Sequence, residues 1–87
     1  MTATIKLLYF ARLRECLGIA GEEVDLPASV QDVAGLLAWL RSRGGNWETE
    51  LRAGRPVLIA VNQNMAQPQH PVCSGDEVAL FPPVSGG

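Results

Sequence analysis

The sequence predicts an α+β fold, and three observations lead to that prediction. The chain has 87 residues, which suits one domain, and 47% of them are apolar, as in ordinary globular proteins. Apolar runs typical of strands occupy residues 4–10, 57–61 and 77–81. Between the first two of these runs, one apolar stripe at helical spacing extends from Val30 to Leu40. The expected architecture is one helix packed against a mixed sheet.

The N-terminal part of the chain predicts a hairpin that contains a helical insert. Residues Thr4–Phe10 are rich in isoleucine, leucine and aromatic side chains and predict the first strand. Ala11–Leu17 predicts a short helix that ends at Gly18. Glu22–Leu26 alternates apolar and polar residues and predicts a second strand, which is expected to pair antiparallel with the first.

The middle of the chain predicts one long helix. Ser29 is the expected N-cap, with Asp32 in the first turn where a negative charge favours the positive helix end. The helix is expected to stop at Gly44, and a helical turn with a loop is expected over residues 46–54. The apolar stripe of this helix consists of Val30, Val33, Leu36, Leu37 and Leu40.

The C-terminal half predicts three further strands. Val57–Val61 is a continuous apolar run and predicts a buried strand, followed by a turn at residues 62–64. Gln67–Pro71 contains two prolines, so any strand there is expected to be a short edge strand. Glu77–Phe81 predicts the last strand, which ends because the two prolines that follow cannot donate to a sheet.

This order of elements favours a β-grasp roll. It predicts a mixed sheet of four to five strands, one long helix and short helical turns, with the first and last strands parallel in the middle of the sheet. The chain then divides into a β-grasp domain at residues 1–81 and a flexible C-terminal tail at residues 82–87.

Composition excludes several classes of function. The net charge is −2 and the basic residues are scattered, so neither nucleic acid nor a membrane is expected as a partner. The two cysteines, Cys16 and Cys73, lie far apart, which favours a reduced, cytoplasmic protein. His70 is the single histidine, so no metal site is expected. Acidic residues such as Glu22 and Glu23 are expected on the solvated surface.

The remaining candidate for chemistry is the C-terminal pair Gly86 and Gly87. A chain ends in two glycines by chance about once in 200 cases, so the pair needs support from its context. Here it directly follows a predicted central strand, and residues 82–87 can extend about 20 Å into a partner. Glycine lets a catalyst approach the terminal carboxyl closely. That carboxylate can attack the α-phosphate of ATP, and sulfur can then displace AMP to give a thiocarboxylate.

Four segments resemble the MoaD family, the small sulfur-carrier subunits of molybdopterin synthase, which are ubiquitin-like β-grasp proteins. The segments are Phe10–Glu15 (FARLRE), Ala60–Gln63 (AVNQ), His70-Pro71 and Gly75–Gly87 (GDEVALFPPVSGG). The last of these is highly specific, because sulfur carriers of thiamine synthesis also end in two glycines but usually lack the Phe-Pro-Pro-Val lead-in. The resemblance covers nearly the whole chain.

The resemblance implies a carrier subunit whose active site lies mainly on its partner. An E1-like (MoeB-like) enzyme would use ATP to convert Gly87 into a glycyl adenylate, and a persulfide donor would turn it into a thiocarboxylate (1-thioglycine). The tail would then insert into the large (MoaE-like) subunit within a heterotetramer. Two sulfur deliveries would convert cyclic pyranopterin monophosphate into molybdopterin, the dithiolene ligand of the molybdenum cofactor. The carrier itself would bind no cofactor.

The strand alternation also predicts where a partner docks. Because side chains alternate along a strand, Ile5, Leu7 and Tyr9 would face the core, together with Val78 and Leu80. Phe10 and Phe81 would then form an exposed apolar patch beside the tail, unless they pack in the core under a loop. The family uses matching positions for docking, with Met65 as a third and Arg14 at the rim. Of the tail itself, Pro82, Pro83, Val84 and Ser85 would enter the partner.

Two alternatives to this function stay open. The chain could carry sulfur for thiamine or cysteine synthesis, or act as a ubiquitin-like modifier joined to lysines. It could instead be an interaction domain whose terminal glycines are incidental. The lead-in at residues 81–84 separates the first alternative from the main hypothesis by resemblance alone.

Overall fold

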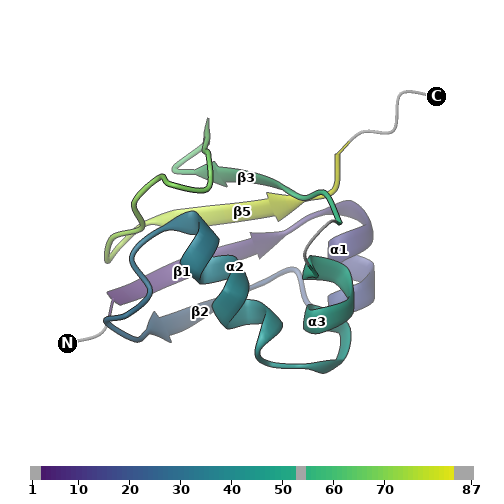
Figure 1. Cartoon of the computed structure of the whole chain (residues 1–87). Helices are drawn as coiled ribbons and strands as arrows, with labels where there is room; N and C mark the ends of the chain where they lie inside the picture. The colour runs from purple at the N-terminus through teal and green to yellow at the C-terminus, as the bar shows by residue number, and fades with distance from the viewer. Residues whose placement is uncertain (1–2, 53–54, 84–87) are drawn as a thin grey trace.

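The computed structural model describes residues 3–52 and 55–83, and it consists of a twisted sheet with helices on one side (Figure 1). The elements in chain order are β1 (Ala3–Tyr9), α1 (Ala11–Leu17), β2 (Gly21–Leu26), α2 (Val33–Arg41), α3 (Gly45–Leu51), β3 (Leu58–Val61), β4 (Asn64–Met65) and β5 (Glu77–Phe81). None of the helices in these described ranges has the length and apolar character needed to cross a membrane.

The sheet is mixed, and its strand order is β2-β1-β5-β3-β4. The first and last strands, β1 and β5, run parallel in its middle, with Leu7 opposite Val78 and Tyr9 opposite Leu80. All the other pairs of neighbouring strands are antiparallel. The predicted β-grasp roll with its parallel central pair is therefore confirmed.

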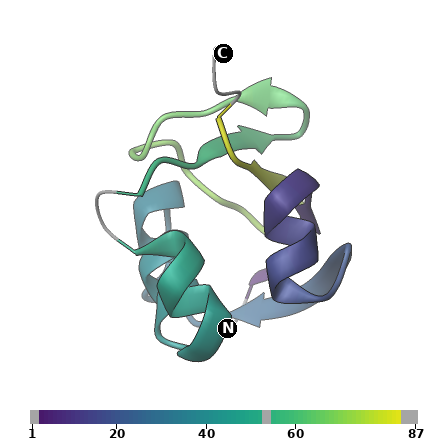
Figure 2. The ribbon, with the colours of Figure 1, turned by 90° about the vertical axis from the view of Figure 1, so that its right-hand side faces the viewer.

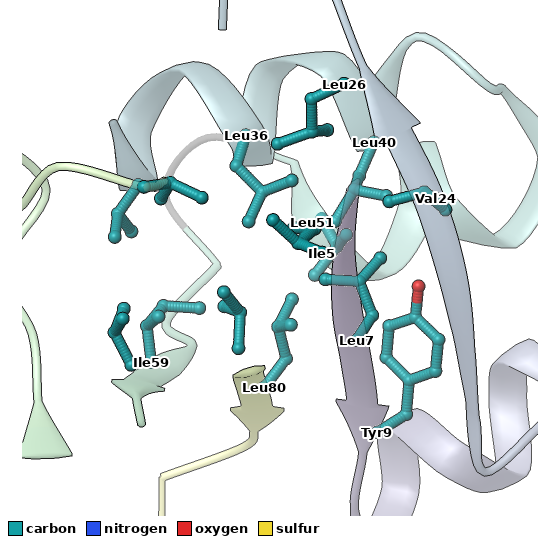
Figure 3. Close-up of a cluster of buried hydrophobic side chains, with 14 of the residues drawn as sticks. Ile5, Leu7, Tyr9, Val24, Leu26, Leu36, Leu40, Leu51, Ile59 and Leu80 are labelled. Carbon is teal, nitrogen blue, oxygen red and sulfur yellow. The ribbon is translucent and has the colours of Figure 1, made fainter. Parts of the chain in front are cut away.

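The core lies between the sheet and the helices (Figure 3). The side chains predicted to face it are confirmed: Ile5, Leu7, Tyr9, Val78 and Leu80 are all almost fully buried. Each of the three helices contributes leucines from the opposite side, and α2 contributes Leu36 and Leu40. The predicted helix Ala11–Leu17 is also confirmed, and it ends where Gly18 adopts a left-handed conformation with φ 79°.

The prediction of one long helix starting near Ser29 is wrong. Helix α2 begins at Val33, and its N-cap is Asp32, whose side chain accepts a hydrogen bond from the Gly35 amide at 2.7 Å. The preceding backbone is extended because residues 31–33 pair with residues 70–72: the Val33 amide donates to the His70 carbonyl, and the Val72 amide to the Gln31 carbonyl. A tertiary pairing thus overrides the local capping signal of Ser29.

The helix also stops earlier than predicted. Its last residue is Arg41 and its C-cap is Ser42, whereas the sequence predicts a stop at Gly44. Gly44 instead has φ 77° and is the N-cap of α3, so it allows the chain to reverse between the two helices. The expected long helix is therefore present but shorter at both ends, and α3 occupies the segment for which a helical turn was expected.

The predicted edge strand at Gln67–Pro71 is also wrong, because the edge strand β4 lies at Asn64–Met65. Asn62 and Gln63 form the turn that leads into it, with φ values of 51° and 70°. Positive φ at two successive residues suits the tightest hairpin turns, and asparagine adopts it more readily than most residues. The Asn62 side chain stabilises the turn by donating to Asp76 at 3.0 Å and accepting from the Glu77 amide at 3.0 Å.

Glu22 was expected on the solvated surface, but it lies in a polar cluster at the edge of the core. Tyr9 donates a hydrogen bond to it at 2.7 Å, and Arg43 contacts both of its oxygens, at 2.7 and 3.1 Å. The Arg43 guanidinium lies 5.2 Å from the ring of Trp39 and 5.1 Å from that of Trp47. The cluster therefore ties β1 and β2 to the turn between α2 and α3.

This cluster makes the stability of the fold sensitive to acid. Desolvation opposes the charge of Glu22, but the hydrogen bonds from Arg43 and Tyr9 outweigh it and lower the pKa of Glu22 below its ordinary value. A lowered pKa stabilises the folded state above the unfolded pKa, and the contribution is lost as the pH falls through the folded value. Glu22→Gln should lower the free energy of unfolding by about 1 kcal/mol at neutral pH.

Urea denaturation followed by circular dichroism at several pH values would measure this effect. The difference between wild type and Glu22→Gln should shrink as the pH falls below about 4.5, the ordinary value for glutamate. The exposed Glu23→Gln serves as the matched control, and its stability should follow that of wild type at every pH. An equal loss in both variants would contradict the assignment.

Candidate functional site

The chain reaches its C-terminal tail from the centre of the sheet. Strand β5 ends at Phe81, and its neighbour β1 ends beside it at Tyr9. Of the tail residues named from the sequence, Pro82 is half-buried and Pro83 is exposed. Val84, Ser85, Gly86 and Gly87 lie outside the described residues. The described structure therefore fixes where the tail starts, at the end of the central strand β5.

The side of the sheet that carries no helix is apolar toward the tail, whereas Thr4, Lys6, Glu23 and Asp25 make its far end polar. The period of two that buries Leu7, Tyr9, Val78 and Leu80 sends the residues between them to this face. The strand pairing aligns the outward residues into rows, one of which joins Leu8 to Ala79, Ala60 and Met65, while the next joins Phe81 to Leu58. These residues, together with Phe10, constitute the outer face as the term is used below.

Phe10 and Phe81 lie together at the end of the outer face nearest the tail. Their ring centroids are 6.4 Å apart and the ring planes are inclined by 80°, an edge-to-face arrangement. The Phe10 side chain is 46% exposed and Phe81 is half-buried, so neither ring belongs to the core. Phe10 follows β1 as the N-cap of α1, rather than ending the strand as predicted, and Ala11 has φ 53° at this abrupt change of direction.

Met65 lies on the outer face in the row next to Phe81, and Arg14 lies on α1 one helical turn after Phe10. Met65 is the most exposed large apolar residue of the described chain, at 62%, and it lies opposite Ala60 in the adjoining row. Arg14 is exposed on α1, and its amide donates to the Phe10 carbonyl, which places it one helical turn away. The structure thus places Phe10, Phe81 and Met65 on the outer face and Arg14 on α1, and the role of all four in docking stays a prediction.

Sequence reasoning missed several residues of the outer face. Leu8, Leu58 and Ala79 are half-buried on this side and connect the ring pair to Met65. Leu8 and Ala79 could have been found from the same alternation that identified the core residues. Leu58 and Ala60 could not, because β3 reads as a continuous apolar run in which both faces look alike.

The side chains considered for other chemistry are dispersed. His70 and Cys73 are exposed in loops, and Cys16 is half-buried on α1. Among residues 3–52 and 55–83, no three histidine, cysteine or acidic side chains gather as they would around a metal ion. The features that can engage a partner in this part of the chain are therefore the outer face and the start of the tail.

Comparison with known proteins connects this arrangement to a family. The chain matches the ThiS family over residues 7–87. It is 41% identical over 83 residues to the molybdopterin synthase sulfur carrier subunit of Escherichia coli K12, and the match covers 95% of this chain and 99% of that protein. The identity extends over nearly the full length of both chains, so it is not confined to the terminal glycines.

Solved structures agree with this relationship. Subunit 1 of a molybdopterin converting factor from Pyrococcus furiosus matches with a TM-score of 0.76 and 31% identity, over 94% of this chain and 99% of that one. SAMP1 from Haloferax volcanii matches with a TM-score of 0.80 and 28% identity, over 98% and 100% of the two chains.

A third solved structure contains a partner subunit. In the complex of subunits 1 and 2 of the molybdopterin-converting factor from Helicobacter pylori, one chain matches with a TM-score of 0.60 and 25% identity, over 97% of this chain and 99% of that one. The β-grasp fold agrees with these matches, and molybdopterin synthase sulfur carrier subunits are relatives of this chain. Because the family match extends over residues 7–87, the protein belongs to the ThiS family.

Proposed function

We propose that this protein is the sulfur carrier subunit of molybdopterin synthase and that Gly87 carries the sulfur. The observation that carries the proposal is the 41% identity to a sulfur carrier subunit over nearly the full length of both chains. The chain adds the chemistry that such a carrier needs, a Gly86-Gly87 end that follows the central strand β5. The alternative of an incidental glycine pair does not account for this similarity.

Activation consumes ATP on a partner, an E1-like enzyme, and needs no cofactor bound to this chain. An oxygen of the Gly87 carboxylate attacks the α-phosphorus of ATP, and pyrophosphate leaves. The terminal sulfur of a persulfide then attacks the carbonyl carbon of the adenylate and displaces AMP, which gives an acyl disulfide. A thiol cleaves the sulfur–sulfur bond, is itself oxidised to a disulfide, and releases the thiocarboxylate. Glycine suits both attacks because it has no side chain that would hinder them.

Delivery takes place on the large synthase subunit. We propose that the outer face docks there, with Phe10, Phe81 and Met65 as apolar anchors and Arg14 at the rim, while residues 82–87 enter the active site. Aromatic side chains that become buried in an interface are typical of the residues that dominate binding energy. Two loaded carriers then supply the two sulfurs that convert cyclic pyranopterin monophosphate into molybdopterin, in a heterotetramer. Cys16 and Cys73 are free thiols, and this state suits a protein of the reducing cytoplasm.

Intact mass spectrometry tests the carrier function directly. The protein is incubated with ATP, an E1-like enzyme and a persulfide donor, and its mass is then measured. The expected result is the increase that corresponds to replacement of one oxygen by sulfur, and it should disappear when ATP is omitted. Cys73→Ser should gain the same mass, because the exposed cysteine takes no part in loading. A wild-type protein that keeps its original mass would contradict the proposal.

A second candidate function is that of a protein modifier, and the likeness to SAMP1 of Haloferax volcanii favours it, since that protein is named small archaeal modifier protein 1. A modifier would transfer the activated Gly87 carbonyl to lysine amines, so the adenylate would react with nitrogen in place of sulfur. In a cell extract with ATP, conjugates heavier than the free protein would then appear. Their absence, with thiocarboxylate present, would leave sulfur transfer as the function.

A further inference from the structure

A small cavity lies at the root of the tail. Figure 2 shows the ribbon from the end of the molecule where β5 finishes. The volume of the cavity is about 170 Å³, enough for a carboxylate group with a few waters. Arg12 of α1 and Glu50 of α3 form part of its wall, together with Arg55 from the segment before β3. Pro82 and Pro83 form another part. The start of the tail is therefore itself one side of this cavity.

The charges around the cavity do not balance. One carboxylate oxygen of Glu50, Oε1, lies 2.9 Å from Nη2 of Arg12 and 3.7 Å from Nη2 of Arg55. Two guanidinium groups therefore share one carboxylate, which leaves one positive charge in a chain whose net charge is −2. A guanidinium has five N–H donors, and Arg12 uses only two of them toward Glu50. The Arg12 side chain is 52% exposed and that of Arg55 is 29% exposed, so further donors are available to an anion.

We propose that this cavity receives an acidic side chain, aspartate or glutamate, from the protein into which the tail inserts. The inference rests on the proposed carrier function, because it requires a partner that encloses the tail. A partner that encloses the tail from Pro83 onward would place the mouth of its channel against the cavity, because Pro82 and Pro83 line it. Arginine pairs well with carboxylates because two parallel N–H donors match the two oxygens.

The position of the cavity favours a partner side chain over a phosphate of ATP. An extended chain advances about 3.3–3.6 Å per residue, so the Gly87 carboxyl of an inserted tail lies about 13 Å beyond Pro83. A phosphate that reacts with this carboxyl is then well outside the cavity. The cavity lies between α1, α3 and the start of the tail, and it meets the outer face at Pro82, which follows Phe81 directly. A protein that covers the ring pair and follows the tail from Pro82 comes within reach of the cavity.

Calorimetric titration with the large synthase subunit of the same organism tests the proposal. Arg12→Gln and Arg55→Gln should each raise Kd about tenfold at low salt, and the effect should shrink at high salt because the pairing is electrostatic. Glu50→Gln should lower Kd severalfold, since it leaves the cavity more positive. Arg52→Gln is the matched control: Arg52 is an exposed arginine outside the cavity wall, and its removal changes the net charge equally.

The outcomes separate the two proposals. If wild type binds and the Arg12 and Arg55 variants match Arg52→Gln, the acidic contact is overturned while the carrier function stands. If these variants bind more weakly at every salt concentration and also melt at lower temperature, the arginines are structural and the proposal is overturned again. If wild type does not bind the large subunit at all, the proposed function fails and the cavity proposal with it.

Discussion

Removal of Gly87 is expected to abolish sulfur loading completely while leaving the fold and its stability unchanged. The reacting group is the terminal carboxyl, and a chain ending at Gly86 presents its carboxyl one residue short, about 3.5 Å from the required position. Reacting atoms must approach within about 3–3.5 Å for catalysis, so a displacement of this size removes the productive geometry. Gly87 has no side chain that could pack in the core, which is why stability should not change.

Intact mass spectrometry and an assay of pterin sulfuration test this prediction together. The shortened chain should show neither the gain in mass nor any formation of molybdopterin. Its thermal midpoint should equal that of wild type, which shows that the loss is chemical. Extension of the chain by one further glycine is the matched control for length, because it keeps every native residue and moves the carboxyl outward; it should also fail to load. Loading of either variant at the wild-type rate would contradict the role of Gly87.

The parts of the fold that the sequence predicts well are those set by local rules. Period-two alternation places Ile5, Leu7 and Tyr9 on the core face, and the structure confirms their burial. Gly18 ends α1 because a left-handed residue is needed there, and glycine adopts that conformation without strain. Such signals depend on neighbours in sequence, so they can be interpreted without knowledge of the tertiary structure.

The errors arise where distant segments decide the local structure. Ser29 has the character of an N-cap, but the pairing of residues 31–33 with residues 70–72 keeps the backbone extended as far as Asp32. The environment of Glu22 likewise depends on Arg43, which is far away along the chain and adjacent only in the folded protein. Nothing near either position in the sequence indicates the contact that overrides the local preference.

The candidate site divides in the same way. Chemistry at Gly87 could be proposed from the sequence because it depends on the end of the chain itself. The ring pair of Phe10 and Phe81 follows from alternation once β1 and β5 are placed side by side. The cavity at the root of the tail could not be predicted, because it brings together Arg12 and Arg55 from segments with no shared pattern.

Phe81→Asp is expected to weaken binding of the large subunit at least about 30-fold while the protein still folds. A buried aromatic anchor at an interface contributes about 2–4 kcal/mol, and each 1.4 kcal/mol is a factor of about ten in Kd. An aspartate within the docked face would add an unpaired charge that loses its water on binding. In the free protein the same side chain lies on the outer face, so solvent reaches its carboxylate and folding should lose only about 1–2 kcal/mol.

The neighbouring residue provides a sharp control for this prediction. Leu80 is fully buried and points to the opposite side of the same strand, so Leu80→Asp places a charge in the core and should unfold the domain. Urea denaturation and calorimetric titration of both variants then separate folding from docking. If Phe81→Asp lost as much stability as Leu80→Asp, Phe81 would belong to the core. If it kept wild-type affinity, the outer face would not be the surface that meets the large subunit, and other contacts would have to position the tail in the active site.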